Sequence, residues 1–128
     1  MRYLSLANGC EADSNILKNE YKYGRIIGHA KLGQSYFLFR RRLTVYYIKY
    51  TDISAFFKRV VLVKAGGREL GIENIVICSG GAEVAQLQMP GRDATDELYR
   101  ALRRLAPDAD RKKPADTTDK PEDTEEMA

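Results

Sequence analysis

The order of the expected elements most constrains this fold, because short β-strands come first and one amphipathic helix comes last. Runs rich in Val, Ile, Tyr and Phe alternate with Gly-rich or polar breaks between residues 25 and 89, which is typical of an antiparallel sheet. In the closing segment Leu98, Ala101, Leu102 and Leu105 recur at helical spacing. One side of this helix can therefore cover a sheet, and the order predicts a small β-barrel capped by a helix.

The breaks between the apolar runs set the strand boundaries. Gly80-Gly81 predicts a tight hairpin between the last two strands, whereas Gly66-Gly67 and Gly71 predict a loose connection before them. The fourth strand is long enough to bend around the corner of a barrel. The predicted strands cover residues 25–30, 35–40, 43–50, 53–63, 74–79 and 83–89.

The closing helix is predicted over residues 93–106. Asp93 is a good N-cap, and Pro107 ends the helical pattern. Acidic residues in the first turn and basic residues in the last turn complement the helix dipole. The basic residues near the C-terminal end are Arg100, Arg103 and Arg104.

Two segments lie outside the predicted barrel of residues 22–106. Residues 1–21 form an N-terminal extension, with a short helix over 11–21 that begins at Asp13 or Ser14. Residues 107–128 contain no Leu, Ile, Val, Phe or Tyr, so no apolar burial offsets the entropy of ordering them. We therefore predict a disordered acidic tail.

Length and charge indicate one domain with a basic body. The chain has 128 residues, which suits a single domain. Residues 1–106 carry 17 Lys or Arg against 10 Asp or Glu, whereas residues 107–128 carry 4 against 8. A basic body is compatible with nucleic acid or an anionic surface as partner, although such a charge is common in soluble domains. The tail could compete with an anionic partner or be a passive extension.

The sequence indicates a soluble, cytoplasmic protein without a metal or cofactor. The first ten residues end in Cys10 but are too polar for a secretory signal, and no run approaches the ~20 apolar residues of a membrane span. His29 is the single histidine, and Cys10 and Cys78 lack metal-ligand spacing. A disulfide between the two cysteines remains open.

A short corner between the third and fourth predicted strands resembles a known family. Its residues are Tyr47, Ile48, Tyr50, Asp52 and Ile53. This Tyr-Ile-x-Tyr-x-Asp-Ile corner is similar to that of bacterial pleckstrin-homology-like (PH-like) and GRAM-like domains. Over residues 22–106 the resemblance implies an antiparallel barrel of six to seven strands capped by one C-terminal helix, in a mainly β (α+β) class. Ligands of such domains include lipids, peptides and proteins, so the fold does not assign a function.

The resemblance disfavours phosphoinositide as a ligand. Members that bind it typically place a lysine late in the first strand and an Arg-x-Arg-like pair early in the second. Here the first strand offers His29 and Lys31, while the second contains Tyr36-Phe37-Leu38-Phe39 without a cation. The conspicuous cations fall in the next turn.

Those cations form the candidate anion site. Arginine makes forked hydrogen bonds to phosphate, so consecutive arginines suit an anionic ligand. The alternative is a solvated hairpin corner that keeps the end of a sheet soluble. The tyrosines nearby could stack on bases, or fill the core and cover the sheet. The candidate residues are Arg40, Arg41, Arg42, Lys58 and Arg59.

No motif supports an enzyme. His29 lacks both an orienting partner and a nucleophile, and Cys78 lies in an apolar run that raises the pKa of a thiol. The sequence therefore predicts a non-catalytic recognition or scaffolding domain that binds a protein or peptide, or a second copy of itself, at an exposed strand edge or barrel-end loop. The alternative function is binding of nucleic acid or an anionic surface through residues 40–42.

Overall fold

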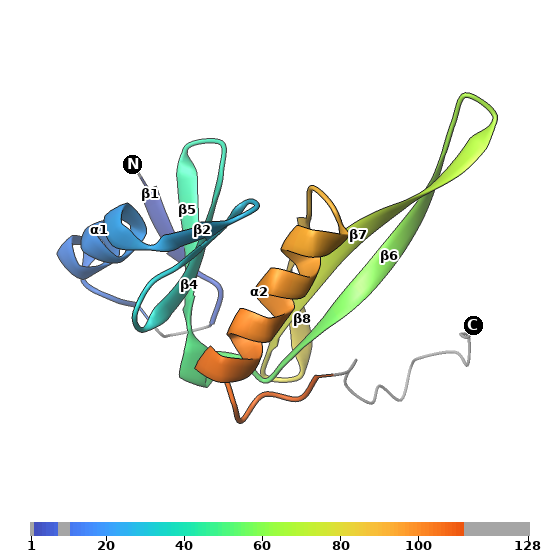
Figure 1. The fold of residues 1–128 in the computed structure, drawn as a ribbon. Helices are drawn as coiled ribbons and strands as arrows, with labels where there is room; N and C mark the ends of the chain where they lie inside the picture. The colour runs from blue at the N-terminus through green and yellow to red at the C-terminus, as the bar shows by residue number, and fades with distance from the viewer. Residues whose placement is uncertain (1, 8–10, 112–128) are drawn as a thin grey trace.

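The computed structural model describes residues 2–7 and 11–111 of the 128-residue chain. Within these residues, eight strands form two sheets, with two α-helices and one 3₁₀ turn (Figure 1). In chain order the elements are β1 (Arg2–Ser5), α1 (Ser14–Tyr23), β2 (Arg25–Ile27), β3 (Ala30–Leu32), β4 (Tyr36–Arg41), β5 (Thr44–Lys49), η1 (Tyr50–Asp52), β6 (Ala55–Ala65), β7 (Arg68–Ser79), β8 (Ala82–Gln88) and α2 (Arg92–Leu105).

The first sheet has five strands in the order β1-β5-β4-β3-β2. β1 runs parallel to β5, and the other neighbours are antiparallel. Two described parts of the predicted N-terminal extension pack with this sheet, because β1 is one of its strands and Leu17 of α1 is buried in one cluster with Leu38 and Val45. The predicted short helix is confirmed at Ser14–Tyr23, where the Asp13 side chain accepts a hydrogen bond from the Asn15 N–H.

The second sheet has three antiparallel strands in the order β6-β7-β8. No described strand pairs across the two sheets, so residues 2–7 and 11–111 do not form the closed PH-like barrel that was expected. The chain passes from the first sheet to the second through η1, which lies between β5 and β6. The mainly β, broadly α+β class is confirmed, with eight strands among the described residues in place of six or seven.

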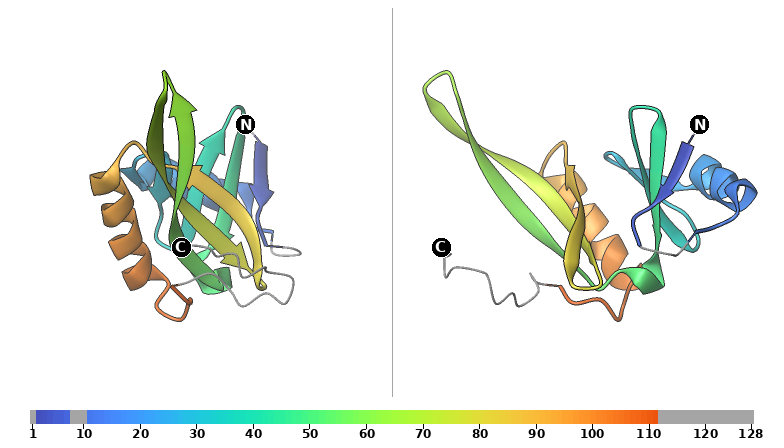
Figure 2. Two further views of the ribbon diagram at one scale, coloured as in Figure 1. Left: turned by 90° about the vertical axis from the view of Figure 1, so that its right-hand side faces the viewer. Right: turned by 180° about the vertical axis from the view of Figure 1, so that it is seen from behind.

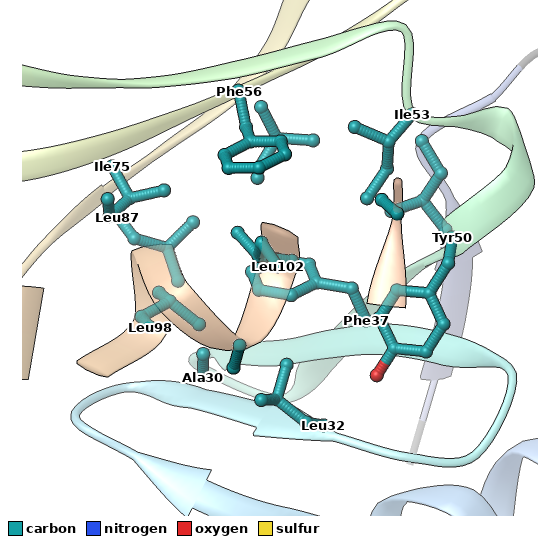
Figure 3. Packing of buried hydrophobic residues seen from close by; sticks show 14 of the residues in the cluster. Ala30, Leu32, Phe37, Tyr50, Ile53, Phe56, Ile75, Leu87, Leu98 and Leu102 are labelled. Carbon is teal, nitrogen blue, oxygen red and sulfur yellow. The ribbon is translucent and has the colours of Figure 1, made fainter. Parts of the chain in front are cut away.

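The core lies between the two sheets, and α2 fills it. Figure 3 shows Leu98 and Leu102 of α2 between Phe56 of one sheet and Ala30 and Leu32 of the other. Both leucines have 0% exposure and Ala101 has 1%, whereas Leu105, the last residue of the predicted apolar stripe, is only partly buried against the same cluster. Burial of a large apolar side chain stabilises a fold by about 1.5–3 kcal/mol, so Leu98 and Leu102 help to hold the two sheets together.

The predicted strand over 25–30 is wrong, because a turn divides it into β2 and β3. Gly28 has φ 61° at that turn, a conformation that costs other residues energy. A Cβ there would lie 2.9 Å from Met89 Cε and 3.0 Å from Pro90 Cδ. In the sequence, the apolar run over residues 25–30 looks like one strand, but the backbone reverses direction at Gly28.

The start of α2 also differs from the prediction. The helix begins at Arg92 after Gly91, and Asp93 lies in its first turn and is not the N-cap. The Thr95 hydroxyl donates instead to the Gly91 carbonyl (2.7 Å). Asp93 still places negative charge near the helix N-terminus, where the dipole favours it.

Residues 107–111 were predicted as the start of the tail, but they pack against the rest of the fold. Ala109 is buried, and the Phe56 N–H donates to the Asp110 carbonyl (2.8 Å). A short segment after α2 therefore lies along the start of β6. The rest of the predicted acidic tail, from residue 112, lies outside the described residues, as does Cys10. Neither described helix is long and apolar enough to cross a membrane.

Candidate functional site

The most distinctive surface feature is a β-hairpin that extends beyond the rest of the molecule. β6 and β7 pair out to Ala65 opposite Arg68, but β8 covers β7 only between Asn74 and Ser79. Figure 1 and Figure 2 show the outer end of this hairpin standing away from both helices and from the first sheet. We call residues 60–73 the β6–β7 arm.

A two-glycine turn forms the tip of the arm. Gly66 and Gly67 have φ 59° and 77°. A two-residue turn that matches the right-handed twist of the flanking strands needs a positive φ at both positions. The predicted loose connection is therefore wrong, and Gly71 lies within β7 opposite Leu62. Gly66-Gly67 between two strand-like runs is the same hairpin signal as Gly80-Gly81.

One edge of the arm belongs to β6. The Phe56 N–H points away from β7, because it donates to the Asp110 carbonyl. Backbone groups alternate in direction along a strand, so every second residue after Phe56 also points outward. Beyond the bridge between Ala55 and Asp110, this edge has no neighbouring strand among the described residues. The outward residues are Lys58, Val60, Leu62 and Lys64.

The other edge belongs to β7. The Met89 N–H donates to the Glu73 carbonyl (2.8 Å), and this bond ends the cover that β8 provides. Pro90 follows and has no N–H to continue the ladder. The same alternation leaves Glu69 and Gly71 outward-facing, beyond the reach of β8. This edge is acidic, whereas the β6 edge is apolar with a lysine at each end.

The arm exposes apolar side chains on both faces. Val60 is 54% exposed and Leu62 65% exposed on one face, while Val63 (39%) lies opposite Leu70 (44%) on the other. An isolated two-stranded hairpin is only marginally stable in water. Contiguous exposed apolar side chains in such a ribbon are typical of a surface that another chain covers.

Arg59 anchors one face of the hairpin where the arm begins. Its guanidinium donates to both carboxylate oxygens of Glu83 (3.0 and 2.6 Å) and to Gln86 Oε1 (3.0 Å). The hydrogen bond with Glu83 raises the pKa of Arg59 above its usual value. Its charge also lies 5.3 Å from the centre of the Phe57 ring. Arg59 is therefore committed to holding β6 to β8.

Lys58 already has binding partners on the opposite face of the hairpin. Its Nζ donates to Asp96 Oδ1 of α2 (2.7 Å) and lies 5.3 Å from the centre of the Tyr99 ring. This hydrogen bond lowers the pKa of Asp96 below its ordinary value. Adjacent residues of a strand point to opposite faces, so Lys58 and Arg59 cannot serve one ligand on the sheet surface.

The side chains of the three consecutive arginines, Arg40 to Arg42, do not all lie at one site. Arg40 donates to the Arg42 carbonyl (2.7 Å), and both residues line an open hollow of about 380 Å³ with His29 and Lys31. Arg41 donates instead to the backbone carbonyl of Gln86 (3.1 Å). The structure therefore brings Arg40 and Arg42 together, but it places the other three predicted cations elsewhere.

The corner that carries the family resemblance has a structural role. Tyr47, Tyr50 and Ile53 are buried. The Tyr50 hydroxyl donates to the Gly33 carbonyl (2.8 Å), and burial raises the pKa of this phenol. The Tyr47 hydroxyl accepts a hydrogen bond from the Ala12 N–H (3.0 Å), so it ties the segment before α1 to the sheet.

A hollow of about 570 Å³ lies beside α1. Its carboxylate, Glu20, accepts hydrogen bonds from the N–H groups of Ser35 and Tyr36 (3.1 and 3.2 Å). Its cation, Arg25, forms an ion pair with Glu97 of α2. Both charged groups of this hollow thus hold secondary structure elements together.

The remaining reactive side chains have no catalytic arrangement within the described residues. Cys78 is a free, buried thiol whose pKa is raised, mainly by burial, as its place in an apolar run predicts. His29 is exposed at the turn between β2 and β3. No three His, Cys, Asp or Glu side chains of residues 2–7 and 11–111 gather where they could hold a metal ion.

No family model, curated protein or solved structure matches this chain. The PH-like resemblance therefore stays a prediction from the corner residues. The candidate site rests on geometry alone, and the β6–β7 arm is its most specific element.

Proposed function

We propose that this chain is a non-catalytic protein-interaction module that binds a partner strand along the β6 edge of the β6–β7 arm. The observation that carries the proposal is an edge of outward-facing backbone groups with two exposed apolar residues, Val60 and Leu62. Strand addition at such an edge combines main-chain hydrogen bonds with side-chain contacts on alternate residues.

The β6 edge suits strand addition better than the β7 edge. A net hydrogen bond contributes about 0.5–1.5 kcal/mol, and covering half-exposed Val60 and Leu62 adds apolar burial. The β7 edge offers Glu69 and Gly71, which provide little apolar surface. Lys64 and Lys58 at the ends of the β6 edge restrict indiscriminate pairing, since edge lysines oppose aggregation.

The decisive variant is Val60→Pro. The Val60 N–H points outward, so proline removes a donor for the partner without removing a β6–β7 hydrogen bond. Loss of one bond, with a partner carbonyl left unpaired, should weaken binding by about 10- to 100-fold. Val60→Ala is the matched control, because it shortens the side chain and keeps the N–H.

A photo-crosslinking amino acid in place of Leu62, introduced in native cells, would capture the partner. The same group in place of Leu43, which is 73% exposed on the β4–β5 turn, reports random encounters. We expect a discrete product from position 62 that disappears with Val60→Pro and persists with Val60→Ala. A product near twice 14.5 kDa would identify a second copy as the partner. Equal products from both positions, or one unaffected by Val60→Pro, would refute strand addition.

A further inference from the structure

Four arginines converge where α2 ends. Arg100, Arg103 and Arg104 lie on the last turns of the helix, and Arg111 comes from the segment that turns back toward β6. Together they line one open hollow of about 410 Å³, and all four side chains are exposed. We call these four residues the arginine cluster.

No described carboxylate forms a salt bridge with any member of the cluster, although Arg100 interacts electrostatically with Asp96 one turn earlier on the helix. The salt bridges of the described residues involve Arg25, Lys58 and Arg59, each with its own acid. Asp108 and Asp110 are close in sequence but do not line the hollow. Arg103, Arg104 and Arg111 have no acidic partner among the described residues, so the cluster concentrates positive charge that Asp96 offsets only at Arg100.

The helix dipole accounts for only part of this charge. A helix C-terminus carries roughly half a negative elementary charge, which favours one nearby cation. Residues three and four apart on a helix are neighbours, so Arg100 repels both Arg103 and Arg104. Arg111 adds a fourth positive charge from a different segment. An anionic ligand would relieve this repulsion, and guanidinium groups bind phosphate oxygens through paired hydrogen bonds.

We propose that the arginine cluster binds the phosphodiester backbone of a nucleic acid. The hollow is open and lined by long side chains, which suits a continuous strand passing over it. A membrane surface fits less well, because a helix lying on lipid inserts its apolar face and Leu98 and Leu102 are already buried. No large apolar side chain of residues 92–111 is among the exposed ones.

This site differs from the sequence-based anion site in a testable way. Arg100→Gln/Arg103→Gln/Arg104→Gln and Arg40→Gln/Arg41→Gln/Arg42→Gln each remove three positive charges from the full chain. The second variant is the matched control, since a uniform effect of net charge would affect both equally. Circular dichroism of both variants verifies that the fold is retained.

The measurement is fluorescence anisotropy of labelled single-stranded and duplex 20-mers, titrated with full-length protein at 50–300 mM salt. We expect the α2 variant to bind at least about 10-fold more weakly at 50 mM salt, and the control to stay within about 3-fold. The slope of log affinity against log salt should fall by about 2–3, because each phosphate contact contributes about 0.7–0.9.

Several outcomes would overturn the proposal. These are no binding by the unaltered chain at 50 mM salt, equal losses in the two variants, or a loss confined to the 40–42 variant. Vesicles containing phosphatidylserine are the remaining binding partner to be tested. Tighter binding to these vesicles than to either 20-mer would replace nucleic acid with an anionic membrane surface. Each of these results leaves strand addition at the β6–β7 arm untouched, since Val60 lies outside the arginine cluster.

Discussion

Replacing Leu102 by alanine should destabilise the whole fold, because this side chain lies between the two sheets. Leu102 has 0% exposure and lies in one apolar cluster with Phe37 of β4 and Phe56 of β6 (Figure 3). The substitution removes three carbon groups, each worth about 0.8 kcal/mol of burial, or roughly 2.4 kcal/mol in total. The cavity left behind adds about 1–2 kcal/mol, so we expect a loss of about 3–4 kcal/mol.

The assay is urea unfolding followed by circular dichroism and tyrosine fluorescence. Domains of this size are stable by about 5–15 kcal/mol, so the variant should fold with a much lower midpoint. Leu43→Ala is the control, because Leu43 is 73% exposed and should change stability by less than about 0.5 kcal/mol.

Hydrogen exchange provides a second measure for Leu102→Ala. Because the side chain contacts a core that both sheets share, amides of β4 and β7 should lose protection together. A loss below about 1 kcal/mol, or lost protection in only one sheet, would refute the view that α2 joins the sheets.

Three further outcomes are expected. Asp96→Asn should cost stability near neutral pH. The hydrogen bond with Lys58 lowers the pKa of Asp96. The carboxylate therefore contributes its stability above the ordinary pKa of 3.8, and this contribution is lost as the pH falls through the lowered pKa. Urea unfolding of both proteins from pH 6 to pH 2 should show the difference in stability vanish. Gly28→Ala should destabilise more than Gly80→Ala in thermal unfolding. Both glycines have φ 61°, but only a Cβ at Gly28 meets other atoms, so equal losses would contradict the steric argument. Deleting residues 112–128, which contain six acidic and three basic residues, should tighten binding to the 20-mers if this segment competes for the cations; unchanged affinity would make it a passive extension.

The sequence predicted the elements whose signals are local. The stripe of Leu98, Ala101 and Leu102 predicted α2, and Gly80-Gly81 predicted the hairpin of β7 and β8. The cations of the arginine cluster that share α2 were also visible as one group near its end. Periodicity and turn residues express nearest-neighbour geometry, so they can be read without knowing the rest of the fold.

Other features depended on segments that are distant in sequence. β1 pairs with β5 across some forty residues, and Arg111 reaches the hollow only because residues 107–111 fold back on β6. Lys58 and Arg59 point to opposite faces of β6, as neighbours on a strand do, but only the folded chain pairs them with Asp96 and Glu83.

By itself, the sequence determined both helices and most of the strands, because hydrophobic period and turn chemistry act within a few residues; β1, the division of β2 from β3 and the outer half of β7 were not among its predictions. Only the tertiary structure decided that the strands form two open sheets, that α2 joins them, and that the β6–β7 arm extends beyond every other described strand. These features depend on which apolar faces meet and which strand edges find partners, and both are properties of the whole folded chain.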